Sequence, residues 1–445
     1  MSRRQAFIAV NRFGLGARPG ELDLVARDPQ RWIERQIRRG QAVPREFAEL
    51  PDAADSIRVF LQSRRQGVRE IKRVARSTLR ARYIDEVNAR ARAHVRTKDP
   101  FHERMVAFWS NHFTVSAKRF FVAPLAGPYE REAIRPHVFG KFEDMLLAVV
   151  HHPAMLFYLD NVASIGPGSR AARFSRRGLN ENLARELLEL HTLGVDGGYG
   201  QADVRALARI LTGWSVEGLG RRQHLSGRYQ FRFFAHEPGP KLLLGRRYAE
   251  DGEAEGIAAL RALARHPATA RFIATKLARH FIADTPPQAA ITALAHSFTK
   301  SGGDLAAVSR TLVRLKAVWN EPLPKVKTPY EYTISIFRAL AVDRTPGRGY
   351  HPAFFLLGQM PFAAPSPKGW PDTAADWLAP EALMRRIEFA RTLSRRLPRR
   401  LDPLPVLEAS IGPVATRRTR TVISRAPSAR EAMALLFASS EFQRR

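Results

Sequence analysis

Residues 180–194 read NENLARELLELHTLG, and this segment constrains the fold more than any other. Leucines recur at positions 183, 187 and 190 along one face of a helix, and further leucines lie on its flanks. A helix that is apolar around most of its circumference is normally internal. The chain must therefore pack other elements against several sides of this leucine-rich helix.

The leucine-rich helix also carries polar side chains, whose burial is costly unless they are paired or used. Glu186 and Glu189 are three residues apart, so their carboxylates can converge as metal ligands or as an acid–base pair. The alternative is a structural network in which each glutamate pairs with an arginine. His191 points away from Glu189 unless the helix is distorted at its end. We therefore assign His191, with Asn182, to a structural polar core.

The amino-acid composition limits the binding partners and the metal or catalytic sites that the chain can support. The 445 residues include 72 Lys and Arg against 42 Asp and Glu, a formal net charge of +30. This excess favours an anionic partner such as nucleic acid, an anionic membrane surface, an acidic polysaccharide or an acidic protein, unless it only reflects general arginine usage. The chain has no cysteine, which excludes disulfides, thiolate metal sites and thiol catalysis. Any metal would need His, Asp or Glu ligands.

Residues 53–96 form the most basic segment. A narrow apolar stripe through it predicts an amphipathic helical arm laid on the body of the protein, with a positive outer face. Residues 64–96 could contact the phosphates of a nucleic acid, although such a face is more often simply solvated. No aromatic residues alternate with the arginines as stacking platforms, which weakens a single-strand interpretation.

Two further segments supply chemically able groups. Residues 101–115 predict a core helix, with His112 facing inward beside Asn111. An inward histidine of this kind is either a ligand or, more commonly, a hydrogen-bonded core residue. Residues 228–248 alternate apolar and polar side chains and predict a β-hairpin. The expected turn brings together His236, Glu237 and Lys241, either as a functional cluster or as surface decoration.

The remaining segments predict a mainly α fold, a single large multi-helix domain over residues 1–445 with one small β-hairpin insertion. Residues 344–373 are rich in proline, glycine and aromatic residues, which indicates an ordered wrapping loop. The basic segment 164–179 predicts an anion-binding or lid loop, or a disordered one. No apolar run is long enough to span a bilayer, and no signal-peptide pattern is evident, so a cytoplasmic location is expected.

Several motifs together resemble the bacterial family named domain of unknown function 1800, over essentially the whole chain. They are NRFGLG at 11–16, FWSNHF at 108–113, HPAML at 152–156, the leucine-rich helix, LTGW at 211–214, HEPGPK at 236–241, KTPYE at 327–331, GW at 369–370 and ASSEF at 438–442. The resemblance implies no established activity. It implies genes beside a sulfatase- and phosphatase-like family, and an envelope location for members with export signals. The family's hairpin usually reads His-Asp, whereas this chain has Glu237.

Three functional hypotheses follow. The first is an enzyme acting on an anionic substrate, with Glu186, Glu189, His236 and Lys241 as catalytic groups. A divalent metal could be bound by His112, Glu186, Glu189 and Glu237. The second is a basic binding or assembly protein for an acidic partner, such as the phosphatase-like neighbour, or for an anionic polymer. The third is nucleic-acid binding through residues 64–96.

Overall fold

The computed structural model describes residues 3–219, 225–342, 347 and 349–445. It confirms a mainly helical fold with a small hairpin element. One large apolar core runs from Ala6 in the first helix to Phe442 near the end of the chain. That residues 1–445 form one domain stays a prediction.

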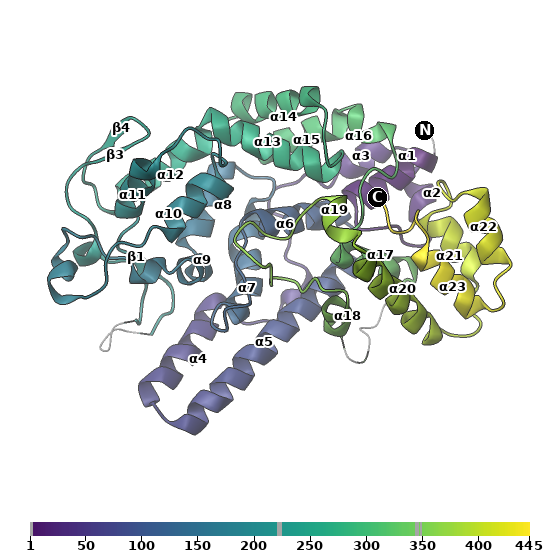
Figure 1. Cartoon of the computed structure of the whole chain (residues 1–445), viewed down its shortest axis with the longest axis horizontal. Helices are drawn as coiled ribbons and strands as arrows, with labels where there is room; N and C mark the ends of the chain where they lie inside the picture. The colour runs from purple at the N-terminus through teal and green to yellow at the C-terminus, as the bar shows by residue number, and fades with distance from the viewer. Residues whose placement is uncertain (1–2, 220–224, 343–346, 348) are drawn as a thin grey trace.

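The N-terminal segment lies beside the C-terminal residues (Figure 1). Its elements are α1 (Arg3–Ile8), the π-helix η1 (Ala9–Phe13), α2 (Glu21–Val25), α3 (Pro29–Glu34) and the 3-10 helix η2 (Arg45–Phe47). Arg12 in η1 is buried and donates to the carbonyl oxygens of Val318 and Glu321, which ties this segment to the later helices.

Helices α4 (Ala53–Gln66) and α5 (Arg69–Arg96) form an antiparallel arm that projects from the body (Figure 1). A capping box between Asp52 and Asp55 begins α4, and Gly67 turns the chain with a φ of 72°. Basic side chains in the outer part, residues 64–80, are exposed, whereas Arg90 at the inner end is buried against Glu130. The expected positive outer face is therefore confined to the outer half of α5.

The middle of the chain contains the leucine-rich helix and a series of other helices. They are α6 (Pro100–His112), α7 (Ala123–Tyr129), η3 (Glu130–Ile134), η4 (Arg135–His137), α8 (Phe142–His151), α9 (Pro153–Tyr158), η5 (Asn161–Ala163), η6 (Arg170–Phe174) and α11 (Gln201–Ile210). The leucine-rich helix itself is α10 (Asn182–Glu186), which continues as the π-helix η7 (Leu187–His191). Leu183, Leu187 and Leu188 are fully buried, as its apolar pattern requires.

The small sheets differ from the expected pairing. Strand β1 (Trp214–Val216) pairs with β2 (Tyr229–Phe231), and β3 (Lys241–Leu243) pairs with β4 (Arg246–Tyr248), both antiparallel. The expected hairpin across the turn at 236–241 is therefore wrong, because β2 and β3 belong to different two-stranded sheets. The 3-10 helix η8 (Phe233–Ala235) follows β2 and redirects the chain before β3.

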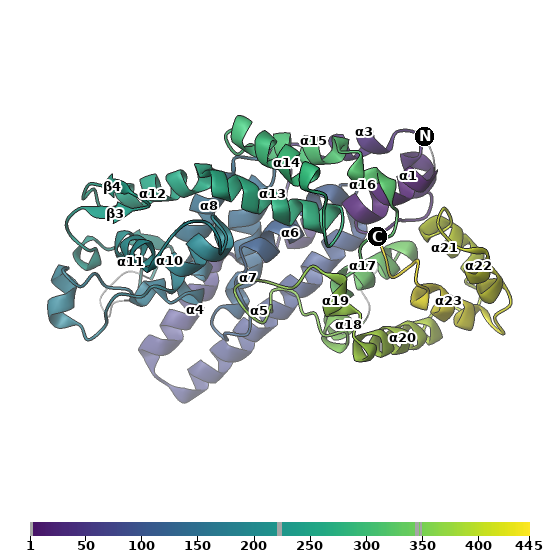
Figure 2. The same cartoon turned by 45° about the horizontal axis from the view of Figure 1, so that its top comes forward.

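The second half is helical. Its elements are α12 (Glu253–Arg265), α13 (Pro267–Phe281), α14 (Gln288–Lys300), α15 (Leu305–Arg314), α16 (Ala317–Asn320), α17 (Pro329–Ala339), α18 (His351–Leu356), α19 (Ala374–Trp377), α20 (Pro380–Arg395), α21 (Pro403–Ser410), α22 (Arg417–Ser424) and α23 (Ala429–Ala438). Helices α12 to α15 follow one long edge, and α20 to α23 form the end opposite the sheets (Figures 1 and 2). Helix α17 is buried along its whole length and lies between these groups.

Candidate functional site

A cavity of about 480 Å³ lies between α6, α13, α17 and the segment 359–376. Its size is in the range of small-molecule sites. Five cationic and three acidic side chains line it: Arg90, Arg104, Lys276, Arg279, Lys368, Glu331, Asp372 and Asp376. Aromatic rings of Phe108, Tyr330, Phe362 and Trp370 complete its wall. The central cavity, as we call it, is therefore amphipathic with an excess of positive charge.

The segment that closes the cavity is held to α6 by a two-way amide clamp. The side chain of Asn111 donates to the carbonyl oxygen of Trp370 at 2.9 Å and accepts from its amide nitrogen at 2.7 Å. Gly369 has a φ of 85°, and a Cβ there would lie 2.4 Å from the carbonyl oxygen of Asn111. Only glycine fits this close approach, which explains the Gly-Trp pair in physical terms.

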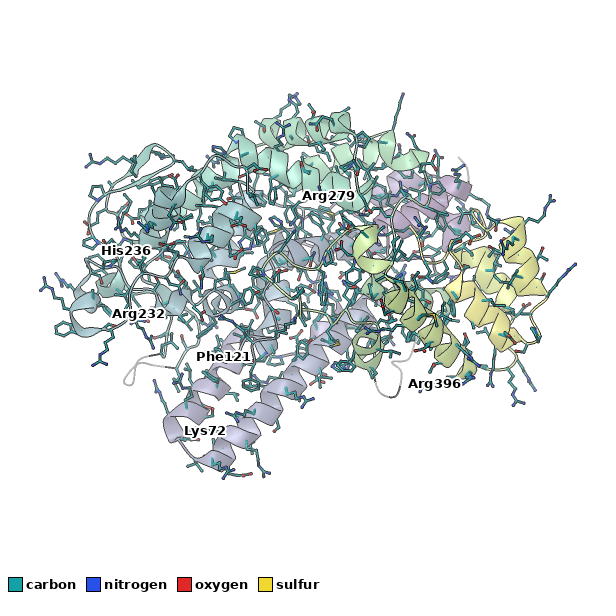
Figure 3. The ribbon with its side chains drawn as sticks, viewed as in Figure 1. Lys72, Phe121, Arg232, His236, Arg279 and Arg396 are labelled. Atoms are coloured by element: carbon teal, nitrogen blue, oxygen red, sulfur yellow. The ribbon has the colours of Figure 1, made fainter. Side chains whose placement is uncertain are left out.

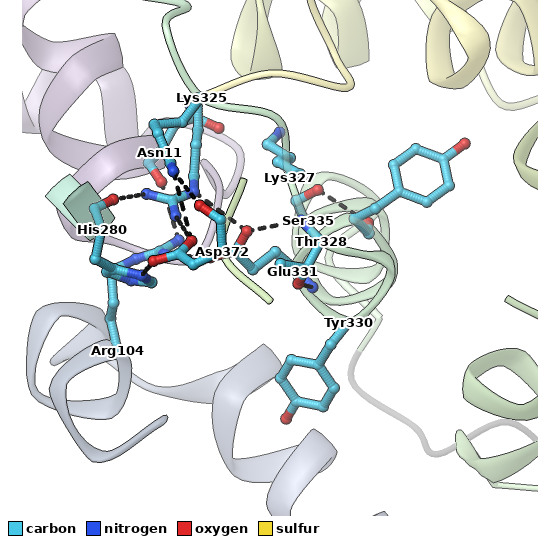
Figure 4. Close-up of polar contacts among 12 residues, drawn as sticks. Asn11, Arg104, His280, Lys325, Lys327, Thr328, Tyr330, Glu331, Ser335 and Asp372 are labelled. Atoms are coloured by element: carbon cyan, nitrogen blue, oxygen red, sulfur yellow. Dashed lines mark hydrogen bonds and ion pairs between the residues drawn. The ribbon is translucent and has the colours of Figure 1, made fainter. Parts of the chain in front are cut away.

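A buried ion network forms one wall of the central cavity (Figure 4). The Glu331 carboxylate binds Arg104 on one side and the Nε of Arg445, at 3.2 Å, on the other. Arg104 also donates to the carbonyl oxygens of Gly14 and Asn11. Burial alone would raise the pKa of Glu331, but the two guanidinium groups outweigh it and hold the pKa at about 2.

His280 and Asp372 form a second pair in the same wall (Figure 4). The Nδ1 of His280 lies 2.7 Å from Oδ2 of Asp372. Burial opposes ionisation of Asp372, yet His280, Lys325 and Arg445 keep its pKa well below the usual range. Burial lowers the pKa of His280 despite this carboxylate, so the imidazole is neutral at pH 7 and Nδ1 donates. Its Nε2 keeps a lone pair, whose nearest donor is Arg104 at 3.4 Å.

Lys276 and His112 also line the central cavity. Burial lowers the pKa of Lys276 to about 8, so most of this amine is still protonated at pH 7. His112 is buried, and its Nε2 donates to the carbonyl oxygen of His191 at 3.1 Å. Burial, and then Lys276, lowers the pKa of both histidines, so both are neutral. His191 is buried, and Asn111 is half-buried in the wall of the central cavity. Asn182 is exposed at the start of α10, which contradicts its assignment to a structural polar core.

Glu186 and Glu189 are close enough to influence one another. Burial, followed by the charge of Glu189, raises the pKa of Glu186 to about 6. Both side chains are half-buried, and neither lines the central cavity. Within the described residues, no hydrogen bond or ion pair joins this pair to His112, His236 or Lys241, nor does an arginine pair with either carboxylate.

The predicted His236 and Lys241 do meet, but in a buried cluster rather than on a surface turn. Lys241 Nζ lies 2.7 Å from Oε1 of Glu255 and donates to the carbonyl oxygen of Glu237. His236 lies 3.0 Å from the same Glu255 oxygen and contacts the Thr212 carbonyl through Nδ1. The side chains of His236, Lys241 and Glu255 are all buried. Figure 3 shows His236 far from Arg279 of the central cavity.

The expected metal ligands do not converge. The Glu237 carboxylate accepts from the amide of Gly168 at 2.7 Å and so anchors the segment 164–179. His112 faces the central cavity, and Glu186 and Glu189 lie elsewhere. In the part of the chain that the structure describes, no group of three or more His, Asp or Glu side chains could hold a metal ion.

Pattern reasoning from the sequence missed the central residues Arg104, His280, Glu331, Asp372 and Arg445. The family motifs could have indicated this site, because residues of several motifs lie together around the central cavity. KTPYE supplies Glu331, NRFGLG supplies the carbonyls that bind Arg104, and Asp372 follows the Gly-Trp pair by two residues. FWSNHF supplies the clamp and His112.

Fold and site together define a mainly helical protein with a basic central cavity. The chain matches the family model described as "Protein of unknown function (DUF1800)" over residues 8–444, and it belongs to this family. No curated protein and no solved structure matches the chain. Among the described residues, no helix is both long and apolar enough to cross a bilayer.

Proposed function

We propose that the protein is an enzyme that binds an anionic small molecule in the central cavity and uses His280 as a general base. The observation that carries this proposal is the His280–Asp372 pair in the wall of a cavity with more cations than acids. Asp372 fixes the tautomer of the imidazole, so Nε2 can accept a proton from water or from a substrate hydroxyl. An imidazole acts as a general base in its neutral form.

The cations supply binding and charge stabilisation. Lys276, Arg279 and Lys368 line the cavity, and among the described side chains none of the three forms an ion pair with a carboxylate, so they are available for a phosphate, sulfate or carboxylate group. Arg104 is already engaged by Glu331 and backbone carbonyls, which makes it a positioning group for His280. The amide clamp of Asn111 on Trp370 keeps the covering segment in place.

The test combines ligand binding with turnover. Inorganic phosphate or sulfate should raise the melting temperature above that in sodium chloride of equal ionic strength, and the double variant Lys276→Met/Arg279→Met should lose the effect. Esters of the stabilising anion should then be hydrolysed, with His280→Gln lowering kcat by about 10²-fold or more. Arg73→Met, on the exposed arm, is the control. Stabilisation by neither anion, or turnover that His280→Gln leaves unchanged, contradicts the proposal.

A second function is favoured by the arm. The outer part of α4 and α5 exposes Arg64, Arg69, Lys72, Arg76 and Arg80. This surface suits an acidic partner protein, an anionic polymer or, as the third hypothesis, nucleic acid. Charge reversal at Arg69 and Arg76 should abolish salt-sensitive binding of such a partner and leave phosphate binding in the central cavity unchanged.

A further inference from the structure

A second hollow, of about 420 Å³, lies on the surface at the end of the molecule that carries the small sheets. The segment 164–179 and the stretch after β2 form its walls. Six side chains matter for its chemistry: Ile165, Arg170, Phe174, Arg177, Arg232 and Phe234. We call it the Arg/Phe hollow. Arg232 marks its position in Figure 3.

The walls of the Arg/Phe hollow are fixed parts of the fold. The amide of Gly166 donates to the carbonyl oxygen of Ala235 at 3.0 Å, and the amide of Gly168 donates to Glu237. A Cβ at Gly166 would lie 2.6 Å from the Cα of Glu237, so the two segments approach more closely than any other residue allows. The hollow is therefore not a gap beneath a loose loop.

Positive charge in the hollow is uncompensated. Within the described residues, none of Arg170, Arg177 and Arg232 forms an ion pair with a carboxylate. The Nε of Arg232 is buried without a hydrogen-bond acceptor, and after burial itself the charge of Arg177 lowers the pKa of Arg232. The nearby Glu237 is occupied by Gly168 and lies 4.0 Å from Arg209. Clustered guanidinium groups of this kind bind phosphates well.

Exposed aromatic rings surround the same arginines. Phe174 is 92% exposed, Phe233 64% and Phe234 47%. The guanidinium of Arg232 lies over the ring of Phe234, 5.2 Å from its centroid. Contiguous exposed apolar surface beside polar groups commonly marks an interaction site, because water contact with the rings is unfavourable. The lining of the hollow thus combines the apolar Ile165, the exposed rings of Phe174 and Phe234, and three arginines.

We propose that the Arg/Phe hollow docks onto the surface of an anionic phospholipid bilayer. Phe174 and Phe233 enter the boundary between headgroups and acyl chains, while Arg170, Arg177 and Arg232 bind lipid phosphates. This pairing of rings and cations is the chemistry of interfacial membrane binding. Exposed phenylalanine rings partition into the boundary region of a bilayer, whereas a nucleic acid would cover them only where its bases stack on each ring. The site is separate from the central cavity and goes beyond the proposed function.

The test is co-sedimentation of the full chain with vesicles of phosphatidylcholine alone or with phosphatidylglycerol added. We expect binding only to the anionic vesicles. The double variant Arg170→Gln/Arg177→Gln should weaken it about 30-fold, since each arginine near the surface contributes about fivefold. A matched double variant, Arg399→Gln/Arg400→Gln, removes two exposed arginines at the other end of the molecule and should change binding far less.

Because the whole chain is basic, it could bind anionic vesicles through general charge attraction. The aromatic variants distinguish binding through the hollow from this general attraction. Phe174→Ser/Phe233→Ser should reduce vesicle binding about tenfold without changing the melting temperature, since both rings are exposed. Phe355→Ser, a 74% exposed ring on α18 across the arm, should have no effect. Equal losses in both aromatic variants, or no loss in either, overturn the proposal. So does binding of a fluorescent oligo(dT) strand that the hollow variants abolish while vesicle binding persists.

Discussion

Replacement of Glu331 by glutamine tests whether the ion network of the central cavity holds the fold together. Glu331 is 8% exposed and lies between the guanidinium groups of Arg104 and Arg445. In Glu331→Gln the amide cannot neutralise either group, so two buried cations remain close together. Removing one partner of a buried ion pair typically costs about 3–5 kcal/mol of unfolding free energy.

The pKa shift of Glu331 gives an independent magnitude. The pKa falls from 4.5 to about 2 on folding. This lowering of the pKa corresponds to about 3 kcal/mol of stability at pH 7. Because the folded-state pKa is depressed, this contribution is complete well above pH 4.5 and is lost as the pH falls toward 2. At pH 3.5 about 2 kcal/mol should remain.

Urea denaturation of both proteins at pH 7 and pH 3.5 measures the difference directly. The matched control is Glu388→Gln, which removes an exposed carboxylate on α20 and should change stability by less than about 0.5 kcal/mol. The reasoning is refuted if Glu331→Gln costs less than about 1 kcal/mol at pH 7. It is also refuted if the cost is the same at both pH values.

Two further predictions concern the residues first expected to be catalytic. Lys241→Met leaves the buried carboxylate of Glu255 unpaired and should lower the unfolding free energy by about 3–5 kcal/mol. The double variant Lys241→Met/Glu255→Leu should recover part of this loss. A loss below about 1 kcal/mol, measured by urea denaturation, would show that the cluster is not structural. Glu186→Gln should raise the melting temperature at pH 8 but not at pH 4, because burial raises the pKa of Glu186 to about 6 and ionisation above that pH opposes folding. A scanning calorimetry result that is the same at both pH values would contradict the raised pKa.

Local patterns in the sequence were sufficient for the elements that local forces determine. The 3.6-residue periodicity predicted the helical class, and the apolar leucines of residues 180–194 correctly placed that helix in the core. The strand pairing was not predictable in the same way. Each strand has only three residues, and the 3-10 helix at Phe233–Ala235 separates β2 from β3. The π-helical turn at Leu187–His191 likewise has no simple periodic signature.

The central cavity escaped prediction because its residues are distant in the chain. Arg104 and Glu331 are 227 positions apart, and His280 and Asp372 are 92 apart. No spacing rule joins such residues, since only the packing of α6, α13 and α17 brings them together. The predicted clusters, by contrast, consist of residues that are close together in the sequence. That criterion identified Lys241 of the Lys241–Glu255 ion pair, but not its partner. Glu255, the carboxylate of this ion pair, lies 14 residues further along the chain on α12 and is outside the predicted turn.

Several buried arginines donate hydrogen bonds to backbone carbonyl oxygens. Arg12 and Arg386 are buried and donate to backbone carbonyls, and Arg104 divides its donors between carbonyls and Glu331. A carbonyl satisfies the hydrogen bonds of a guanidinium but does not cancel its charge. The lining of the central cavity itself has five cationic and three acidic side chains, and binding of an anion would offset this positive excess. An anionic ligand should consequently stabilise the folded chain by mass action, whatever reaction His280 supports.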